Sequence, residues 1–181
     1  RSPSLFELEQ AWLKAHGKTA EDGLVIQLGT LSKTLMPALR IGWTLGPAAL
    51  IEKLAVLKQA QDLHTPTANQ VIGYELASRI RGQHVESLRN AYRLRRDAMI
   101  DALTRHMPEG VKFNAPGGGM FTWLELPAEI DAKKLLAKAL ETAKIAFVPG
   151  AAFHADGTGQ NTLRLSFSTC SPQQIDEGMR R

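Results

Sequence analysis

The sequence has 181 residues, 44% of them hydrophobic, and its 22 basic and 18 acidic residues give a formal net charge of +4. This length suits one medium domain or parts of two, and the scattered charges do not predict a nucleic-acid-binding arm. The single cysteine, Cys170, excludes a disulfide framework and a cysteine-based zinc site, and the five histidines show no metal-ligand spacing. No apolar run approaches the ~20 residues needed to span a bilayer. We therefore expect a soluble, cytoplasmic protein without a metal, a nucleic-acid partner or a membrane partner.

The first half of the sequence predicts short strands between helices. Ser4 and Glu7 have the spacing of a capping box, which marks the start of a helix. Gly82 is expected to interrupt the helical pattern that follows Pro66. From hydrophobic periodicity, the predicted strands cover residues 24–28 and 39–45, and the predicted helices cover residues 4–16, 47–62 and 66–79.

The second half changes character near residue 85. A long helix is predicted over residues 85–106, and a mixture of strands and helices follows it. The predicted strands cover residues 111–113, 120–126, 145–148 and 162–167, and the predicted helices cover residues 131–142 and 172 onward. This pattern predicts an α/β fold in which residues 1–84 form part of a larger sheet domain. Residues 85–181 are predicted to form a small α+β domain, reached through the long helix.

A lysine lies between the two strands of the first half. Within the segment of residues 28–43, Lys33 follows the hydroxyl residues Thr30 and Ser32, and Arg40 comes seven residues later. A lysine amine condenses with an aldehyde, and hydroxyl and guanidinium groups bind a phosphate. Partial desolvation would lower the proton affinity of the amine and make it a usable nucleophile and base. The residue types alone leave an ordinary loop lysine and a strand-edge arginine equally open.

A glycine-rich segment, residues 116–127, invites comparison with a phosphate-binding loop. Such loops lead into the N-terminus of a helix. This segment leads instead into a strand rich in aromatic residues, beginning at Phe121. It is therefore interpreted as a tight backbone turn.

An arginine, Arg164, lies in the otherwise apolar strand of residues 162–167. Burying a guanidinium is costly unless an anion pairs with it, and its planar fork suits a carboxylate. The alternative to a bound ligand is a structural salt bridge.

These three segments, together with residues 147–153, resemble in order and spacing the motifs of fold-type-I aminotransferases that depend on pyridoxal 5′-phosphate (PLP). The resemblance is to class I/II, in the branch that handles aminoadipate, kynurenine and branched or aromatic amino acids. It implies that Lys33 forms the covalent link with PLP and is the catalytic residue. It also implies that Thr30, Ser32 and Arg40 bind the cofactor and that Arg164 binds the α-carboxylate of the substrate.

The sequence departs from the family pattern at two places in the lysine segment. Thr30 stands where the family usually has serine, which keeps the hydroxyl group, and Ala38 stands where it usually has glycine. The alanine is expected to tighten the turn slightly.

The resemblance also implies an architecture and an activity. Residues 1–84 would be the C-terminal part of the large PLP-binding domain, and residues 85–181 the small C-terminal domain. The enzyme would be a homodimer that transfers an amino group between a 2-amino acid and a 2-oxo acid such as 2-oxoglutarate. In the family, several cofactor contacts come from the half before the lysine, and this chain opens on Arg1 without a methionine. We therefore expect that the chain alone does not sustain transamination.

Two alternatives share the fold. One is the aminotransferase-like, effector-sensing domain of a transcription regulator, and the other is a module without catalytic activity. Regulators of this kind usually show a histidine near the position of Phe121, so the run from Gly119 to Trp123 favours the enzyme.

Overall fold

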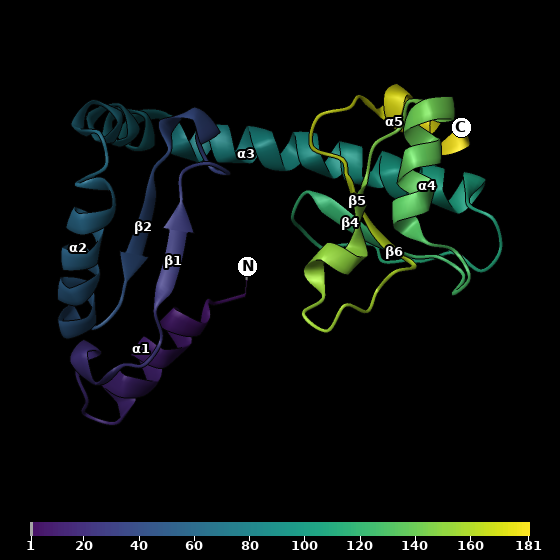
Figure 1. Ribbon diagram of the computed structural model, residues 1–181. Coiled ribbons are helices and arrows are strands. Elements are labelled where there is room, and N and C mark those ends of the chain that lie inside the picture. The colour runs from purple at the N-terminus through teal and green to yellow at the C-terminus, as the bar shows by residue number, and fades with distance from the viewer. Residues whose placement is uncertain (1) are drawn as a thin grey trace. The chain divides into compact units, whose positions relative to one another are not determined.

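The computed structural model describes residues 2–181, which form two compact units that divide between Glu86 and Ser87 (Figure 1). The first unit contains α1 (Leu5–Ala15), β1 (Gln27–Thr30), β2 (Gly42–Leu45) and α2 (Ala48–Asp62). The second contains β3 (Lys112–Phe113), β4 (Phe121–Glu125), α4 (Ala132–Lys138), β5 (Val148–Pro149), β6 (Thr162–Ser166) and α5 (Pro172–Arg180). Helix α3 (Thr67–His106) begins in the first unit and ends in the second. Among residues 2–181, no helix combines the length and the apolarity needed to cross a membrane.

Helix α1 begins at the capping box predicted from the sequence. The Ser4 hydroxyl accepts a hydrogen bond from the Glu7 backbone N–H at 3.2 Å, and the Glu7 carboxylate accepts one from the Ser4 N–H at 2.6 Å. Further along the helix, the Glu9 carboxylate accepts bonds from the backbone N–H groups of Leu24 and Val25 at 2.7 and 3.1 Å. Glu9 therefore ties α1 to the segment before β1.

Strands β1 and β2 form an antiparallel pair, with Gln27 opposite Leu45 and Thr30 opposite Gly42. The prediction placed the first strand at residues 24–28, but β1 begins later because Glu9 binds the backbone N–H groups of residues 24 and 25. The second strand also begins later than predicted, because residues 37–39 form a 3₁₀ turn before it.

The predicted break at Gly82 is wrong, because α3 continues without interruption over 40 residues. A glycine costs a helix only about 1 kcal/mol relative to alanine, and the residues on both sides extend the helix across it. The helix ends at His106 because Pro108 follows closely, and Arg105 and His106 in its last turn complement the helix dipole.

The second unit is built on a four-stranded antiparallel sheet in the order β3-β4-β6-β5. Side chains alternate between the two faces of each strand. On one face, Leu124 lies opposite Leu163, and both side chains are buried. On the other face, Trp123 lies opposite Arg164, and neither is fully buried. The sheet therefore has a core face and an open face.

The core of the second unit covers the core face of this sheet. Its buried residues come from α3, β4, α4, β6, α5 and the segments beside the strands: Met99, Ala102, Leu103, Leu124, Leu126, Ala132, Leu163, Leu165, Phe167 and Ile175. Phe167 and Leu103 are its largest fully buried apolar side chains. Helix α4 begins at Asp131, whose carboxylate accepts hydrogen bonds from two backbone N–H groups, and it runs on into a short π-helical segment, Ala139–Ala143.

Candidate functional site

The lysine singled out by the sequence lies on a tight turn directly after β1. The Leu31 carbonyl accepts hydrogen bonds from the backbone N–H groups of Leu35 and Met36 at 2.9 and 3.1 Å, which closes the turn over residues 31–36. Lys33 is exposed on this turn, and its side chain makes no hydrogen bond or ion pair with residues 2–181. Its amine is therefore available to a ligand.

The two hydroxyl groups beside Lys33 differ in their bonding. Thr30 Oγ1 donates to the Ile41 carbonyl at 3.1 Å and accepts from the Ser32 backbone N–H at 3.1 Å. Its proton is thus used to join the two ends of the turn. Ser32 Oγ, which is half-buried, has no hydrogen-bond partner in the described part of the chain. Ser32 is accordingly the hydroxyl that can donate to a phosphate without breaking a bond within the chain.

Arg40 lies just before β2 in a left-handed backbone conformation, with φ at 52°. For a residue with a Cβ atom this conformation is unfavourable by roughly 1–2 kcal/mol. Its Nη1 donates to the Pro37 carbonyl at 3.1 Å, and the guanidinium is otherwise exposed. The neighbouring Leu39 is buried, and its carbonyl accepts a bond from Asn69 Nδ2 at 3.2 Å. These two bonds hold the backbone that leads into Arg40.

Ala38, which replaces the usual glycine, lies inside the 3₁₀ turn of residues 37–39. Its backbone does not have a positive φ. Because any L-residue adopts such a conformation, the alanine is compatible with this turn.

Arg164 lies on the open face of the second unit's sheet, in the middle of β6. Its guanidinium carbon lies 4.0 Å from the ring centroid of Phe121 and 4.7 Å from that of Phe153. No carboxylate among residues 2–181 forms an ion pair with Arg164, so these residues do not form the structural salt bridge that the sequence left open. Two aromatic rings stabilise the cation instead. Its Nε is buried without a hydrogen-bond partner in the described residues.

Phe153 is a neighbour of Arg164 that the sequence reasoning missed. The ring of Trp123 meets it edge-on, with the centroids 5.6 Å apart. Strand alternation was a signal for part of this arrangement, because Phe121 and Trp123 share a face of β4 and Trp123 pairs with Arg164. The strand periodicity could not have placed Phe153, which comes from the short 3₁₀ helix Gly150–Phe153 after β5.

An acidic residue, Asp156, follows Phe153 by three residues in the segment between β5 and β6. The Thr158 hydroxyl and backbone N–H both donate to the Asp156 carboxylate, at 2.7 and 3.1 Å, and these bonds lower the pKa of Asp156. The same hydroxyl lies 3.0 Å from His154 Nδ1, and the His154 ring lies 6.2 Å from that of Trp123. The bonds to Thr158 therefore favour the ionised form of the Asp156 carboxylate.

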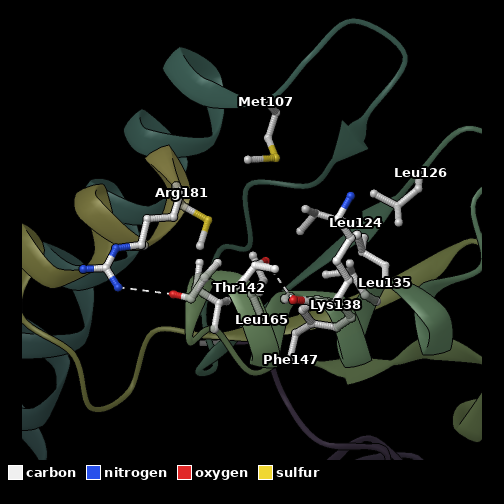
Figure 2. A pocket seen from close by; sticks show the side chains of 15 residues that line it. Met107, Leu124, Leu126, Leu135, Lys138, Thr142, Phe147, Leu165 and Arg181 are labelled. Carbon is white, nitrogen blue, oxygen red and sulfur yellow. Dashed lines mark hydrogen bonds between the residues drawn. The ribbon is translucent and has the colours of Figure 1, made fainter.

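A cavity of about 300 Å³ lies on the opposite, core face of the sheet (Figure 2). Leu163 and Leu165, which flank Arg164 in β6, line it together with residues of α4 and the π-helical segment. At its rim, Arg181 Nη1 donates to the Ala143 carbonyl at 3.2 Å. The lining is mostly apolar, with Lys138, Thr142 and Arg181 as its polar members, and no cluster of metal-ligating side chains occurs among residues 2–181. This cavity is a feature of packing, and the chemistry-bearing groups lie elsewhere.

The residues predicted from the sequence thus fall into two groups. Thr30, Ser32, Lys33 and Arg40 lie between the end of β1 and the start of β2 in the first unit, and Arg164 lies on the open face of the sheet in the second. Within the first group, an unpaired lysine amine accompanies hydroxyl and guanidinium groups, and these are groups that can bond to an aldehyde and donate to a phosphate.

Comparison with known proteins shows the family of this chain. The family model described as "Aminotransferase class I and II" matches residues 5–181, and the chain belongs to this family. It is 42% identical over 181 residues to the 2-aminoadipate transaminase of Thermus thermophilus, covering all of this chain but 43% of that protein. The chain therefore spans less than half the length of the relative it matches.

A solved structure shows the same fold. The α-aminoadipate aminotransferase LysN from Thermus thermophilus, complexed with N-(5′-phosphopyridoxyl)-L-leucine, matches with a TM-score of 0.89 at 42% identity, over 99% of this chain and 44% of that one. The predicted fold class, the C-terminal portion of a fold-type-I PLP enzyme, is confirmed. Among the relatives is also the helix-turn-helix regulator YdfD of Bacillus subtilis, 35% identical over 88% of this chain and 33% of that protein.

Proposed function

We propose that this chain supplies the cofactor lysine and the substrate-carboxylate arginine of a PLP-dependent aminotransferase. The enzyme would transfer the amino group of a 2-amino acid to a 2-oxo acid such as 2-oxoglutarate. The observation that carries the proposal is the loop after β1, which places an unpaired lysine amine beside a free hydroxyl and an exposed guanidinium. The similarity to a 2-aminoadipate transaminase supports an amino acid of that kind as the donor.

The loop after β1 fits PLP by the chemistry of its donors. Ser32 Oγ and the guanidinium of Arg40 can donate to phosphate oxygens, and Lys33 Nζ can bond to an aldehyde carbon. In Thr30, the third predicted phosphate ligand, the hydroxyl proton is engaged by Ile41, so it would have to exchange that bond for the phosphate. We therefore rank Ser32 and Arg40 above Thr30 as phosphate ligands.

Each residue has a separate task in the proposed reaction. PLP, when bound, supplies an aldehyde for amines and a conjugated ring that withdraws electrons from the bonds at the substrate Cα. Lys33 Nζ would take the proton from the substrate Cα as a general base, and the resulting ammonium could release it elsewhere as a general acid. Arg164 holds the substrate carboxylate and so orients the Cα–H bond, and Ser32 and Arg40 hold the phosphate.

The test is to trap the lysine. The chain is incubated with PLP, reduced with sodium borohydride, digested and mapped by mass spectrometry. We expect a phosphopyridoxyl group on Lys33, and its loss in Lys33→Arg. Lys53→Arg, a change at an exposed lysine of α2, serves as the matched control and should leave the adduct in place. Labelling spread evenly over the exposed lysines would overturn the proposal.

A regulator is the second candidate, because YdfD is among the relatives of this chain. An effector-sensing domain could hold PLP through the same lysine without completing the reaction. The aromatic residue at position 121 favours the enzyme, because its ring stacks on the guanidinium assigned to the substrate. The sequence that precedes this segment in its gene separates the two: an aminotransferase large domain supports the enzyme, and a winged-helix head supports the regulator.

We also propose that the complete enzyme is a homodimer in the cytoplasm. Leu24 and Leu28, beside and in β1, are 90% and 76% exposed, and apolar surface of this kind marks a protein interface. The single cysteine, Cys170, is exposed and free, which suits a reducing compartment. Sedimentation of the complete enzyme should give twice the mass of one chain.

A further inference from the structure

The guanidinium of Arg164 lies over two aromatic rings. Phe121, from β4, lies 4.0 Å from the guanidinium carbon, and Phe153, from the segment after β5, lies 4.7 Å from it. Each such contact is worth about 0.5–1 kcal/mol at an exposed site and more when it is desolvated. Together they restrict the plane of a group that would otherwise rotate freely on a flexible stem.

The rings themselves are held in place. Phe121 is fixed by the register of β4 on β6, where it lies opposite Ser166. Phe153 meets the edge of the Trp123 ring at a centroid distance of 5.6 Å and an interplanar angle of 76°. The two rings therefore approach Arg164 from separate elements of one unit.

The buried nitrogen of Arg164 shows which edge of the guanidinium faces a ligand. Nε is inaccessible to solvent and has no partner within residues 2–181. A carboxylate cannot reach that edge without displacing protein atoms, so the two Nη groups at the tip are the donors that remain. An Nη-to-carboxylate pair with two parallel hydrogen bonds requires a fixed guanidinium plane.

We propose that Phe121 and Phe153 are positioning residues that fix the guanidinium plane of Arg164, so that it takes the substrate carboxylate end-on through its two Nη groups. The inference rests on the proposed function, in which Arg164 binds that carboxylate. Loss of a ring would free the guanidinium to rotate. Binding of the carboxylate would then be weakened by the conformational entropy lost when the guanidinium is fixed again.

The experiment follows the Nε–H signal of Arg164 by ¹H–¹⁵N NMR on the whole chain. The signal is assigned by its loss in Arg164→Lys, and 2-oxoglutarate is titrated at constant ionic strength. In the unsubstituted chain we expect a saturable shift and slow exchange of the buried Nε–H with water. Phe121→Leu should weaken 2-oxoglutarate binding by about 5-fold, the equivalent of ~1 kcal/mol, and speed up Nε–H exchange.

Three comparisons separate the possible outcomes. Phe121→Tyr keeps an aromatic face and should restore both readings, and Phe153→Leu should act in the same direction as Phe121→Leu. Phe147→Leu changes a phenylalanine that lines the cavity on the core face, and should leave both readings unchanged. Equal effects of Phe121→Leu and Phe147→Leu would overturn the positioning role while leaving Arg164 as a carboxylate ligand. If the Arg164 signal of the unsubstituted chain does not respond to 2-oxoglutarate, the proposed function of this residue is overturned. If Nε–H exchange is unchanged in Phe121→Leu, the positioning role is overturned independently.

Discussion

The two units of the chain differ in how far their apolar side chains are buried. The second unit buries them in one cluster, in which Phe167 is 1% exposed. In the first unit, among residues 2–86, Leu13 and Leu39 are buried in the core, and Leu24 is 90% exposed. The second unit is thus stabilised from within, and the first unit presents an apolar surface suited to further protein. The lysine loop lies in the unit that depends on such contacts.

The comparison is tested most strongly by removing large apolar side chains from each unit. Phe167→Ala should destabilise the chain by about 3–5 kcal/mol, because it removes a buried ring and leaves a cavity. Leu28→Ala should change the stability by no more than about 0.5 kcal/mol, because the side chain is 76% exposed. Urea unfolding measures both free energies. A loss at Leu28 as large as that at Phe167 would show that the surface of the first unit is covered.

Buried and exposed threonines provide a second test of the same contrast. Thr122 is 1% exposed and donates to the Asn114 carbonyl at 2.8 Å, so Thr122→Val should cost about 1–1.5 kcal/mol by removing this hydrogen bond of a buried hydroxyl. Thr30→Val removes the bond to Ile41 in the first unit, where water can replace the hydroxyl, and should cost less than about 1 kcal/mol. Urea unfolding under one condition measures the loss of unfolding free energy in both variants. A larger loss in Thr30→Val than in Thr122→Val would contradict this account.

The cavity on the core face of the second unit offers a way to stabilise it. Ala139 lines the cavity, and Ala139→Leu should raise the free energy of unfolding by about 0.5–2 kcal/mol by filling it. Ala60→Leu, on an exposed position of α2, is the matched control and should give almost no change. Thermal unfolding detects the difference. Destabilisation by Ala139→Leu would mean that the cavity cannot accept a larger side chain.

A smaller effect is expected at acidic pH, from a cluster that joins α3 to α5. The hydrogen bond from His106 and the charge of Arg105 lower the pKa of Asp176 below 3.8. A carboxyl whose folded pKa is depressed stabilises the fold fully above its unfolded value. That stabilisation is lost as the pH falls from about 3.8 through the lower folded pKa. Asp176→Asn should therefore flatten the stability profile in this range, measured as the midpoint of thermal unfolding against pH. An unchanged profile would contradict the assignment.

Features set by neighbours in the sequence were predictable. The capping box at Ser4 and Glu7 needs residues three apart, and it formed as expected. The start of β1 was not predictable, because Glu9 reaches 15 residues along the chain to bind the N–H of Leu24. The break at Gly82 failed for a different reason, because the local preference of one glycine is small beside a long helix.

The candidate site residues also differ in whether they could be predicted from neighbouring residues in the sequence. The loop of Lys33 is a local structure, and its members could be found as a sequence motif. The surroundings of Arg164 depend on strand register and on a contact from Phe153, which comes from another segment of the unit. Sequence reasoning found the arginine, but it could not find what holds its plane.

The most direct test of the central claim compares PLP with pyridoxal, which lacks the phosphate, in borohydride trapping at Lys33. If Ser32 and Arg40 form a phosphate site beside the lysine, PLP should label Lys33 far more efficiently than pyridoxal. In the double variant Ser32→Ala, Arg40→Leu the two aldehydes should label it about equally. The measurement is the yield of the reduced Lys33 peptide for each aldehyde. Equal labelling of the unsubstituted chain by PLP and pyridoxal would contradict the account, because Lys33 would then be an ordinary exposed amine.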